Sequence, residues 1–472
     1  MTTPLDQFAA LQSYQLPPHQ KSMTPPYAVR SIRLGPAILD VIDEESGFYR
    51  SLVQRLRAAR TLNTPHLDDR HVIDLLVRAA NGWREPHHPF RRLALSVLPE
   101  LTGYAPAMIE EGLDHRLAQL SPERLERLVD AATDQLAKQG LALQGPPVVH
   151  LIVAGHIPAL AIDELAALLF IKSAALVRPS IRDPIVAPLF VRTLAELDPR
   201  VGELLAVAWW PREAESISAA VAGSVDAVVA SGDDGTLAEL SRHAARRDAL
   251  GLIGYGHRRS VALVGADALV ESDALATRTA RDVCWYEQCG CLSPHLVYVE
   301  EGGRLAPREF AERVAVALKR EARRWPPPVM PLNIASTVLQ LRAEMEFREA
   351  DGSAVFSPFG PADRLSGGTV LFDPDPAPRP SPGRRTLWVK PTPRLELAVE
   401  ALAPWRGMLE SIGLALSDTR LDELRPLINR LAPSRLAPIG TMQEPPLRWR
   451  WLEQGLLLRL AAWTPPRSVT HF

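Results

Sequence analysis

The sequence predicts an α/β protein with two α/β domains built on parallel-type sheets and a helical N-terminal part. Three observations lead to this prediction. Short apolar runs alternate with helical segments between residues 147 and 255, as parallel strands alternate with the helices that connect them. Strands and helices alternate again after residue 281. A chain of 472 residues is also too long for one hydrophobic core.

Residues 1–30 are rich in proline and polar side chains, and we expect an irregular extension there. Residues 31–145 have a mainly helical pattern. Ser121 followed by Pro122 marks a helix start, with serine as the N-cap and proline in the first turn. The apolar residues that follow recur at helical spacing and predict one buried stripe: Leu125, Leu128, Val129, Ala132 and Leu136.

The first α/β region begins with the apolar run 148–154, which ends at Gly155 as a buried strand would. Four further strands are expected at 174–177, 204–209, 226–230 and 251–255. The connecting helices are expected at 160–172, 184–197, 212–222 and 233–248. A parallel sheet of this kind binds ligands at the carboxyl ends of its strands.

The second α/β region begins near Asp282. Its expected strands are 296–299, 368–372 and 385–390, its helices are 307–323 and 333–349, and the Pro-rich stretch 373–383 is expected to be a loop. The tail has apolar segments of its own and should pack back onto the body. The predicted division is therefore 1–30, 31–280, 281–425 and 426–472.

Composition limits the classes of partner. The formal net charge is −2, which gives no broad field for binding nucleic acid. The only three cysteines lie between residues 284 and 291, a pattern typical of a reducing, cytoplasmic compartment. Met1 to Ser22 lacks an apolar signal-peptide core, and we expect no membrane span, because no stretch of about 20 uncharged residues occurs.

The cysteine cluster is the sharpest chemical feature of the sequence. A thiol is nucleophilic only as thiolate, and Gly290 would let the backbone approach a substrate closely. A zinc site from the three cysteines and His295 has enough ligands but lacks the C-x₂-C spacing. A disulfide between Cys289 and Cys291 would be near the limit of tolerated geometry. Plain core packing is favoured for Cys284.

The segment from Asp282 to Glu300, with Gln288-Cys289-Gly290-Cys291-Leu292-Ser293-Pro294 at its centre, is similar to the nucleophile segment of LuxC-type acyl-CoA reductases. These belong to the aldehyde dehydrogenase superfamily. Other segments resemble blocks of the family in the same order along the chain: 102–104, 108–109, 112–114, 177–184, 254–260, 413–415, 434–435 and 438–442. The resemblance covers residues 100–455.

The resemblance implies an aldehyde-dehydrogenase-like fold with a Rossmann-like cofactor domain and a catalytic domain. It makes Cys291, directly before Leu292, the acyl-accepting nucleophile. His156 stands where the family's Gly-Asn-x-Pro segment has asparagine, a donor to the oxyanion. A histidine N–H can replace that donor, depending on tautomer, or the ring can simply cap the strand end.

The resemblance also implies cofactor contacts. Arg178 and Ser180 stand where the superfamily binds the adenosine ribose or its phosphate, and arginine there favours NADPH. Without the resemblance, Arg178 is equally well a surface residue at a strand end. Ser231, Gly232 and Thr236 lie between a strand and a helix, where amides can meet a pyrophosphate or form an N-capping turn. The missing Gly-x-Gly-x-x-Gly loop suits this superfamily.

Tyr255 stands nearest to the position where oxidising members of the superfamily have a water-activating glutamate. Acyl reduction needs no such water, so the resemblance implies NADPH-dependent reduction of an acyl thioester to an aldehyde through acyl-Cys291. We expect a homo-oligomer without a metal, supplied by acyl-CoA, an acyl carrier or an acyl-transferring partner protein. Aldehyde oxidation, or a catalytically weakened homologue acting as a binding subunit, are the alternatives.

Overall fold

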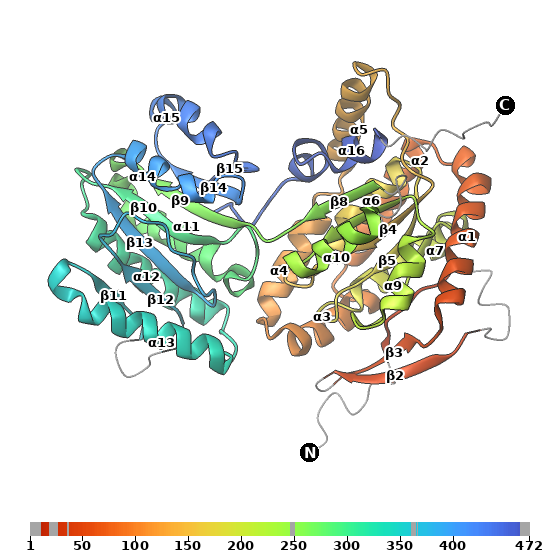
Figure 1. Cartoon of the computed structure of the whole chain (residues 1–472), viewed down its shortest axis with the longest axis horizontal. Helices are drawn as coiled ribbons and strands as arrows, with labels where there is room; N and C mark the ends of the chain where they lie inside the picture. The colour runs from red at the N-terminus through yellow and green to blue at the C-terminus, as the bar shows by residue number, and fades with distance from the viewer. Residues whose placement is uncertain are drawn as a thin grey trace. The chain divides into compact units, whose positions relative to one another are not determined.

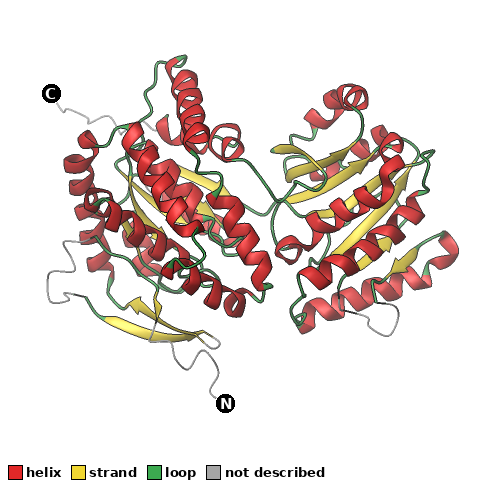
Figure 2. Cartoon of the chain, turned by 180° about the vertical axis from the view of Figure 1, so that it is seen from behind, coloured by secondary structure: helices red, strands yellow, loops and turns green. Residues whose placement is uncertain are grey.

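The chain divides into two compact units, each described here by itself. The computed structural model describes residues 11–17, 27–34, 37–245, 251–359, 365 and 367–462. Unit 1 comprises Met1–Thr102, Ile109–Gly256 and Pro446–Phe472, and unit 2 comprises Gly103–Met108 and His257–Pro445. Each unit contains a sheet covered by helices (Figures 1 and 2). No helix in the described ranges is both long and apolar enough to cross a membrane.

The main sheet of unit 1 has the strand order β6-β5-β4-β7-β8, and all its strands are parallel. The strands are β4 (Val148–Ile152), β5 (Ala174–Arg178), β6 (Leu205–Val207), β7 (Ala227–Ser231) and β8 (Gly251–Tyr255). The connecting helices are α6 (Ala161–Phe170), α7 (Val186–Leu197), α8 (Pro199–Gly202), α9 (Glu215–Ala222) and α10 (Asp234–Ala245). This confirms the predicted series. The order reverses between β4 and β7, where an open parallel sheet forms its ligand crevice.

The helical N-terminal part consists of α1 (Ser46–Asn63), α2 (Asp69–Arg84), α3 (Pro89–Thr102), α4 (Pro106–Leu117) and α5 (Pro122–Ala137), with a short 3₁₀ turn at Thr64–His66. Helix α5 confirms the predicted start, since Ser121 is extended and Pro122 is the first helical residue. The Ser121 side chain, however, makes no capping hydrogen bond. All five residues of the predicted stripe are buried, so apolar burial on one face explains this helix.

The expectation that residues 31–145 are mainly helical is wrong at its start. There β2 (Val29–Leu34) pairs antiparallel with β3 (Ala37–Ile42). In β3 the apolar Ala37, Leu39 and Val41 are buried, while Ile38 is exposed. This alternation of faces is the period of a strand, and it was the signal available in the sequence.

The expected irregular extension is also wrong where the structure describes it. β1 (Leu11–Gln12) pairs parallel with β3 and completes the sheet β1-β3-β2. Gln15 exchanges two backbone hydrogen bonds with Val207 of β6, at 3.0 and 2.7 Å. Residues 11–17 therefore pair with both sheets of unit 1. The rest of the predicted extension, residues 1–10 and 18–26, lies outside the described residues.

The sheet of unit 2 has the order β11-β12-β13-β10-β9-β14-β15, and every pairing is parallel except that of β11. Its strands are β9 (Arg259–Val264), β10 (Pro294–Glu300), β11 (Ala354–Phe356), β12 (Thr369–Phe372), β13 (Thr386–Thr392), β14 (Leu409–Ala415) and β15 (Arg435–Pro438). Its helices are α11 (Ser272–Cys284), α12 (Pro307–Arg324), α13 (Leu332–Phe347), α14 (Leu395–Ala401) and α15 (Asp418–Arg430). The expected loop 373–383 is confirmed between β12 and β13.

The unit boundaries differ from the predicted division. Residues 257–280, which contain β9, were placed with the first domain but belong to unit 2. The predicted tail 426–472 is divided between the units at Pro445 and Pro446. β9 pairs with β10 on one side and β14 on the other, and only this long-range pairing places it in the second sheet.

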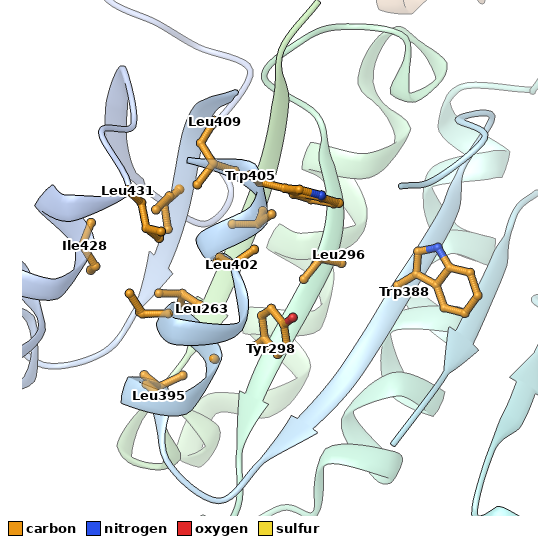
Figure 3. Close-up of a cluster of buried hydrophobic side chains, with 14 of the residues drawn as sticks. Leu263, Leu296, Tyr298, Trp388, Leu395, Leu402, Trp405, Leu409, Ile428 and Leu431 are labelled. Atoms are coloured by element: carbon orange, nitrogen blue, oxygen red, sulfur yellow. The ribbon is translucent and has the colours of Figure 1, made fainter. Parts of the chain in front are cut away.

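The core of unit 2 lies where β9, β10, β13 and β14 meet α14 and α15. Figure 3 shows Leu263, Leu296 and Tyr298 facing Leu395 and Leu402. Tyr298 is fully buried, and its hydroxyl donates to the carbonyl oxygen of Pro376 at 2.6 Å. The strands β9 and β10 are therefore fixed by apolar packing, and the loop that precedes β10 ends on a rigid strand.

Candidate active site

The three thiols differ in exposure. Cys284 ends α11 and is fully buried, and burial raises its pKa to about 12. Cys289 is half-buried, with Sγ 3.5 Å from the carbonyl oxygen of Glu287. Cys291 is exposed, three residues before β10 begins. The core-packing interpretation of Cys284 is therefore confirmed, and Cys291 is the thiol that a substrate can reach most easily.

The alternative interpretations of the cysteine cluster were a zinc site and a disulfide. None of the three cysteines is in a disulfide. In the part of the chain that the structure describes, no group of three or more His, Cys, Asp or Glu is arranged to hold a metal ion. His295 instead accepts a hydrogen bond on Nδ1 from the backbone N–H of Ser381 at 3.0 Å. Burial, with Arg259 and His257 nearby, lowers the pKa of His295 to about 4, so its ring is neutral at pH 7.

The backbone before the cysteines is left-handed. Tyr286, Glu287 and Gln288 have φ values of 53°, 56° and 57°. Side chains other than glycine adopt this region at a cost of roughly 1–2 kcal/mol each. Three such residues in succession persist only when their surroundings hold them, and such strain is concentrated at functional sites.

Gln288 holds this turn through its side-chain amide. Its Nε2 donates to the carbonyl oxygens of Pro294 and Thr386, both at 2.8 Å. Its Oε1 accepts the backbone N–H of Thr386 at 2.7 Å. The amide thus spans the first residues of β10 and β13, where the two strands have not yet begun to pair. Gln288, three residues before Cys291, therefore ties the turn to the starts of two strands.

Glu287 holds the same turn through a buried ion pair with Arg385. Arg385 Nε donates to Glu287 Oε2 at 3.0 Å, and the two side chains are 1% and 2% exposed. Arg385 also donates from Nη2 to the carbonyl oxygen of Trp325 at 2.7 Å. Removing either member would leave a buried charge without its counter-ion.

Backbone contacts hold the residues that follow. Ser260 of β9 donates from Oγ to the carbonyl oxygen of Cys291 at 2.7 Å, and accepts the N–H of Ser411 at 3.0 Å. Gln443 donates from Nε2 to Ser293 Oγ at 2.7 Å. The thiol of Cys291 is therefore presented on a segment whose main chain is fixed on both sides.

The segment 438–442, which resembled a closing block of the family, lies against the start of the nucleophile segment. Asp282 is buried, and its carboxylate accepts the N–H groups of Gly440 and Met442 at 2.5 and 3.1 Å. Burial raises the pKa of Asp282 to about 7, against these two hydrogen bonds. Gly440 has φ +101°, and a Cβ there would lie 2.8 Å from Cβ of Arg278.

In unit 1, His156 lies in the loop after β4. It is exposed, and its Nδ1 lies 3.1 Å from Nη1 of Arg182. A guanidinium only donates, so Nδ1 is the acceptor and a neutral His156 has its proton on Nε2. A Cβ on Gly155 would lie 2.1 Å from Oγ of Ser180, so glycine is required for this close approach. The structure thus brings together two predicted site residues, His156 and Ser180.

Arg178 ends β5 and is half-buried. Its Nε and Nη2 both donate to the carbonyl oxygen of Trp210, at 3.1 and 3.0 Å, and its Cζ lies 5.4 Å from the centre of that ring. Burial lowers the pKa of this guanidinium. One edge of Arg178 is therefore occupied, and Nη1 has no hydrogen-bond partner among the residues that the structure describes.

The turn between β7 and α10 contains the other predicted residues. Asp233 caps α10, accepting the N–H of Thr236 on Oδ1 at 2.7 Å, and this confirms the N-capping turn. Gly232 donates its N–H to the carbonyl oxygen of Tyr255 at 3.2 Å, which links the ends of β7 and β8. Because Asp233 already takes the Thr236 amide, a pyrophosphate would have to displace that cap.

The model of the family described as acyl-CoA reductase (LuxC) matches residues 63–451, more than half of the chain. This chain belongs to the LuxC family. The family match includes both the nucleophile segment of unit 2 and the strand ends of unit 1 described above.

Curated LuxC relatives are distant. The long-chain acyl-protein thioester reductase of Photorhabdus laumondii subsp. laumondii is 22% identical over 244 residues, which are 48% of this chain and 49% of that protein. The Vibrio harveyi protein of the same name is 22% identical over 260 residues, 52% of this chain and 54% of that one. The chain thus matches about half the length of these relatives.

The fold of this LuxC chain is that of the aldehyde dehydrogenases. Lactaldehyde dehydrogenase from Escherichia coli superposes with a TM-score of 0.63 at 16% identity, covering 91% of each chain. Aldehyde dehydrogenase 21 from Physcomitrella patens superposes with a TM-score of 0.68 at 12% identity, covering 91% of this chain and 90% of that one. At such identities the likeness shows the fold, and it confirms the predicted aldehyde-dehydrogenase-like class.

Some residues of this LuxC site were not predicted from the sequence. Arg385 is 98 residues from Glu287, and Gln443 is 150 residues from Ser293, so no local pattern links them. For Arg182 a local signal was available, because it lies in the segment 177–184 that resembles the family, only two residues after Ser180.

Proposed function

We propose that this chain reduces a fatty acyl thioester to an aldehyde with NADPH, through an acyl-Cys291 intermediate. The observation that carries the proposal is the exposed Cys291 thiol on a main chain fixed by Ser260, Gln288 and Gln443. Membership of the LuxC family and relatives named long-chain acyl-protein thioester reductase support it.

In the first step, the Cys291 thiolate attacks the carbonyl carbon of the acyl thioester. The carbon–sulfur bond to the carrier breaks, and the carrier leaves as a thiol after taking a proton. The negative charge that develops on the carbonyl oxygen requires donors, and we assign this role to the backbone N–H of Cys291 and to His156, whose Nε2 carries the proton when the ring is neutral. In the second step, the acyl carbon accepts a hydride, the bond to Cys291 breaks, and aldehyde is released.

NADPH, when bound, supplies the hydride. The residues at the strand ends of unit 1 fit a dinucleotide: Arg178 is a half-buried cation whose Nη1 has no hydrogen-bond partner among the described residues, and Ser180 and Ser231 offer hydroxyls. Gly155 lacks the Cβ that would otherwise crowd Ser180. We assign Arg178, Ser180, Ser231, Gly232 and Thr236 to cofactor binding, with the Asp233 cap limiting what Thr236 can contribute.

The test uses long-chain acyl-CoA and NADPH. Aldehyde should form as NADPH is consumed, and intact-protein mass spectrometry without NADPH should show one acyl group on the chain. Cys291→Ala should abolish both signals, whereas Cys289→Ala, the matched control two residues away, should keep them. Aldehyde formation that persists in Cys291→Ala would overturn the proposal. Acid formation from aldehyde and NADP⁺, without acyl reduction, would favour an oxidising enzyme.

A further inference from the structure

Arg450 lies at the carboxyl ends of two strands of unit 1, although it is close to the end of the described chain. Its Nη2 donates to Glu164 Oε1 at 2.7 Å and lies 3.4 Å from Oγ of Ser231. Its Cζ lies 3.8 Å from the centre of the Tyr255 ring. One guanidinium therefore contacts the first turn of α6, the end of β7 and the end of β8.

The segment around Arg450 is anchored by apolar packing. Arg450 belongs to the π-helical turn Trp449–Glu453, a conformation that is rare in proteins and, where it occurs, is often found at functional sites. Trp451 is fully buried, and its Nε1 donates to the carbonyl oxygen of Asp163 at 3.2 Å. The following helix α16 (Leu456–Ala461) packs against α5 and α6 (Figure 1). The guanidinium is thus held by a packed turn.

Glu164 is an unusual partner. It is 2% exposed, its Oε1 is paired with Arg450, and its Oε2 has no hydrogen-bond partner among the described residues. A buried ion pair adds little net stability over apolar side chains of the same volume, because both charges lose their hydration. Stability alone therefore does not explain this pair. A need to hold the Arg450 guanidinium in a fixed position beside Ser231 does explain it.

We propose that Arg450 is a positioning residue for the nicotinamide cofactor. Paired with Glu164, it fixes the Ser231 hydroxyl and the Tyr255 ring at the strand ends where the cofactor is to bind. This inference rests on the proposed function. Arg450 acts through Ser231 and Tyr255, so its loss loosens the turn 231–236 and weakens cofactor binding without altering the nucleophile segment of unit 2.

The first measurement is the dissociation constant for NADPH, from fluorescence titration of the intact protein. Arg450→Ala should raise it about tenfold or more, the effect of losing a charge-assisted hydrogen bond. Arg450→Lys keeps the charge but not the fork or the flat stacking surface, and should recover part of the affinity. Glu164→Gln should give an intermediate increase. Acylation of Cys291 by acyl-CoA, which needs no cofactor, should proceed at the wild-type rate in all three variants.

The second measurement is hydrogen exchange in the cofactor-free protein. Exchange in residues 231–236 should accelerate in Arg450→Ala and Glu164→Gln, while the strands β4 and β5 keep their wild-type protection. Arg448→Ala is the matched control: Arg448 lies two residues away, its side chain is 62% exposed, and it forms an ion pair with Glu453, whose side chain is 52% exposed. It should change neither measurement.

Unchanged NADPH affinity in Arg450→Ala and Glu164→Gln would overturn the inference and leave the proposed function standing. A lower melting temperature in Arg450→Lys with wild-type affinity would also overturn it, because that result means a structural role alone. If Arg450→Ala fails to fold, Arg450→Lys and Glu164→Gln decide. A wild-type protein that binds neither NADPH nor NADH would overturn the proposed function itself, and this inference with it.

Discussion

At the scale of single residues, the nucleophile segment has a strained backbone that side-chain contacts hold in place. The left-handed turn Tyr286–Gln288 costs roughly 3–6 kcal/mol in backbone energy, taking the three residues together. The Gln288 amide and the Glu287–Arg385 pair offset that cost locally. The result is a short, rigid approach to Cys291, which an acyl-accepting nucleophile needs for a fixed attack geometry.

Glu287→Gln should destabilise the protein by about 3–5 kcal/mol, because it leaves the buried Arg385 without its counter-ion. The free energy of unfolding in urea measures this change. Glu301→Gln is the control, since Glu301 is exposed and should change stability by less than about 0.5 kcal/mol. Equal stabilities for the two variants would mean that the ion pair does not hold the turn.

Arg178→Ala should raise the KM for NADPH about tenfold and the KM for NADH much less, because only NADPH presents a 2′-phosphate to a guanidinium. Steady-state kinetics with both cofactors measure the ratio. Arg70, which is exposed on α2, provides the control substitution Arg70→Ala. Parallel increases for both cofactors would show that Arg178 supports the fold near Trp210 and does not read the phosphate.

At the scale of elements, the closing segment of unit 2 supports the nucleophile segment from behind. Residues 440–443 bind Asp282 through two backbone N–H groups and Ser293 through the Gln443 amide. A turn far along the chain therefore completes the hydrogen bonding of α11 and of the residues before β10. In the sequence, residues 438–442 only resemble a block of the family, and the contact with the nucleophile segment comes from the folded chain.

Gly440→Ala should cost more stability than Gly302→Ala, although both glycines have positive φ values, +101° and +81°. At Gly302 a Cβ meets nothing within 4 Å, so only the roughly 1–2 kcal/mol of left-handed strain applies. At Gly440 the Cβ also crowds Arg278, adding about 1–3 kcal/mol. Thermal unfolding and the rate of Cys291 acylation measure the effect. If the two variants lost the same stability and the same rate of acylation, the turn at Gly440 would not support the nucleophile segment.

At the scale of the whole molecule, each unit has its own main sheet and its own buried ionisable groups. His150 on β4 and His295 on β10 have pKa values lowered to about 4, chiefly by burial. Burial also raises the pKa of Asp163 to about 6 and that of Asp282 to about 7. The histidines disfavour the folded state on acidification, and the aspartates favour it, so the two sets oppose each other below neutral pH.

The histidine contribution can be isolated by difference. Between pH 6.5 and 4 the unfolded chain binds a proton at His150 that the folded chain does not, so the folded state loses about 3 kcal/mol on acidification. His150→Gln cannot take up this proton and should not suffer this loss. Between pH 7 and pH 4, the free energy of unfolding should therefore fall by about 3 kcal/mol more in the wild type than in His150→Gln. Urea unfolding at pH 7 and pH 4 measures it. A stability difference between wild type and His150→Gln that is the same at pH 7 and at pH 4 would refute the assignment.

Much of the fold was predictable because its signals are local. The strands β4, β5, β7, β8 and β10 appear as apolar runs, and the stripe of α5 appears as helical periodicity. The hairpin β2–β3 was missed although its alternating pattern was present, because helical segments dominate the residues after it. β9 was not predicted as a strand, and its residues were placed in the first domain, because strand pairing across the chain, and not local pattern, decides sheet membership.

By itself, the sequence determined the α/β class, the LuxC family and the cysteine to test, because apolar periodicity and short motifs are properties of neighbouring residues. The tertiary structure decided which thiol is exposed, why Gln288 and Glu287 precede it, and that Arg182, Asp282 and Gln443 support the predicted site residues. It also brought Arg450 to Ser231, 219 residues away. Burial and hydrogen bonding between distant segments depend on the folded chain, and therefore no local pattern records them.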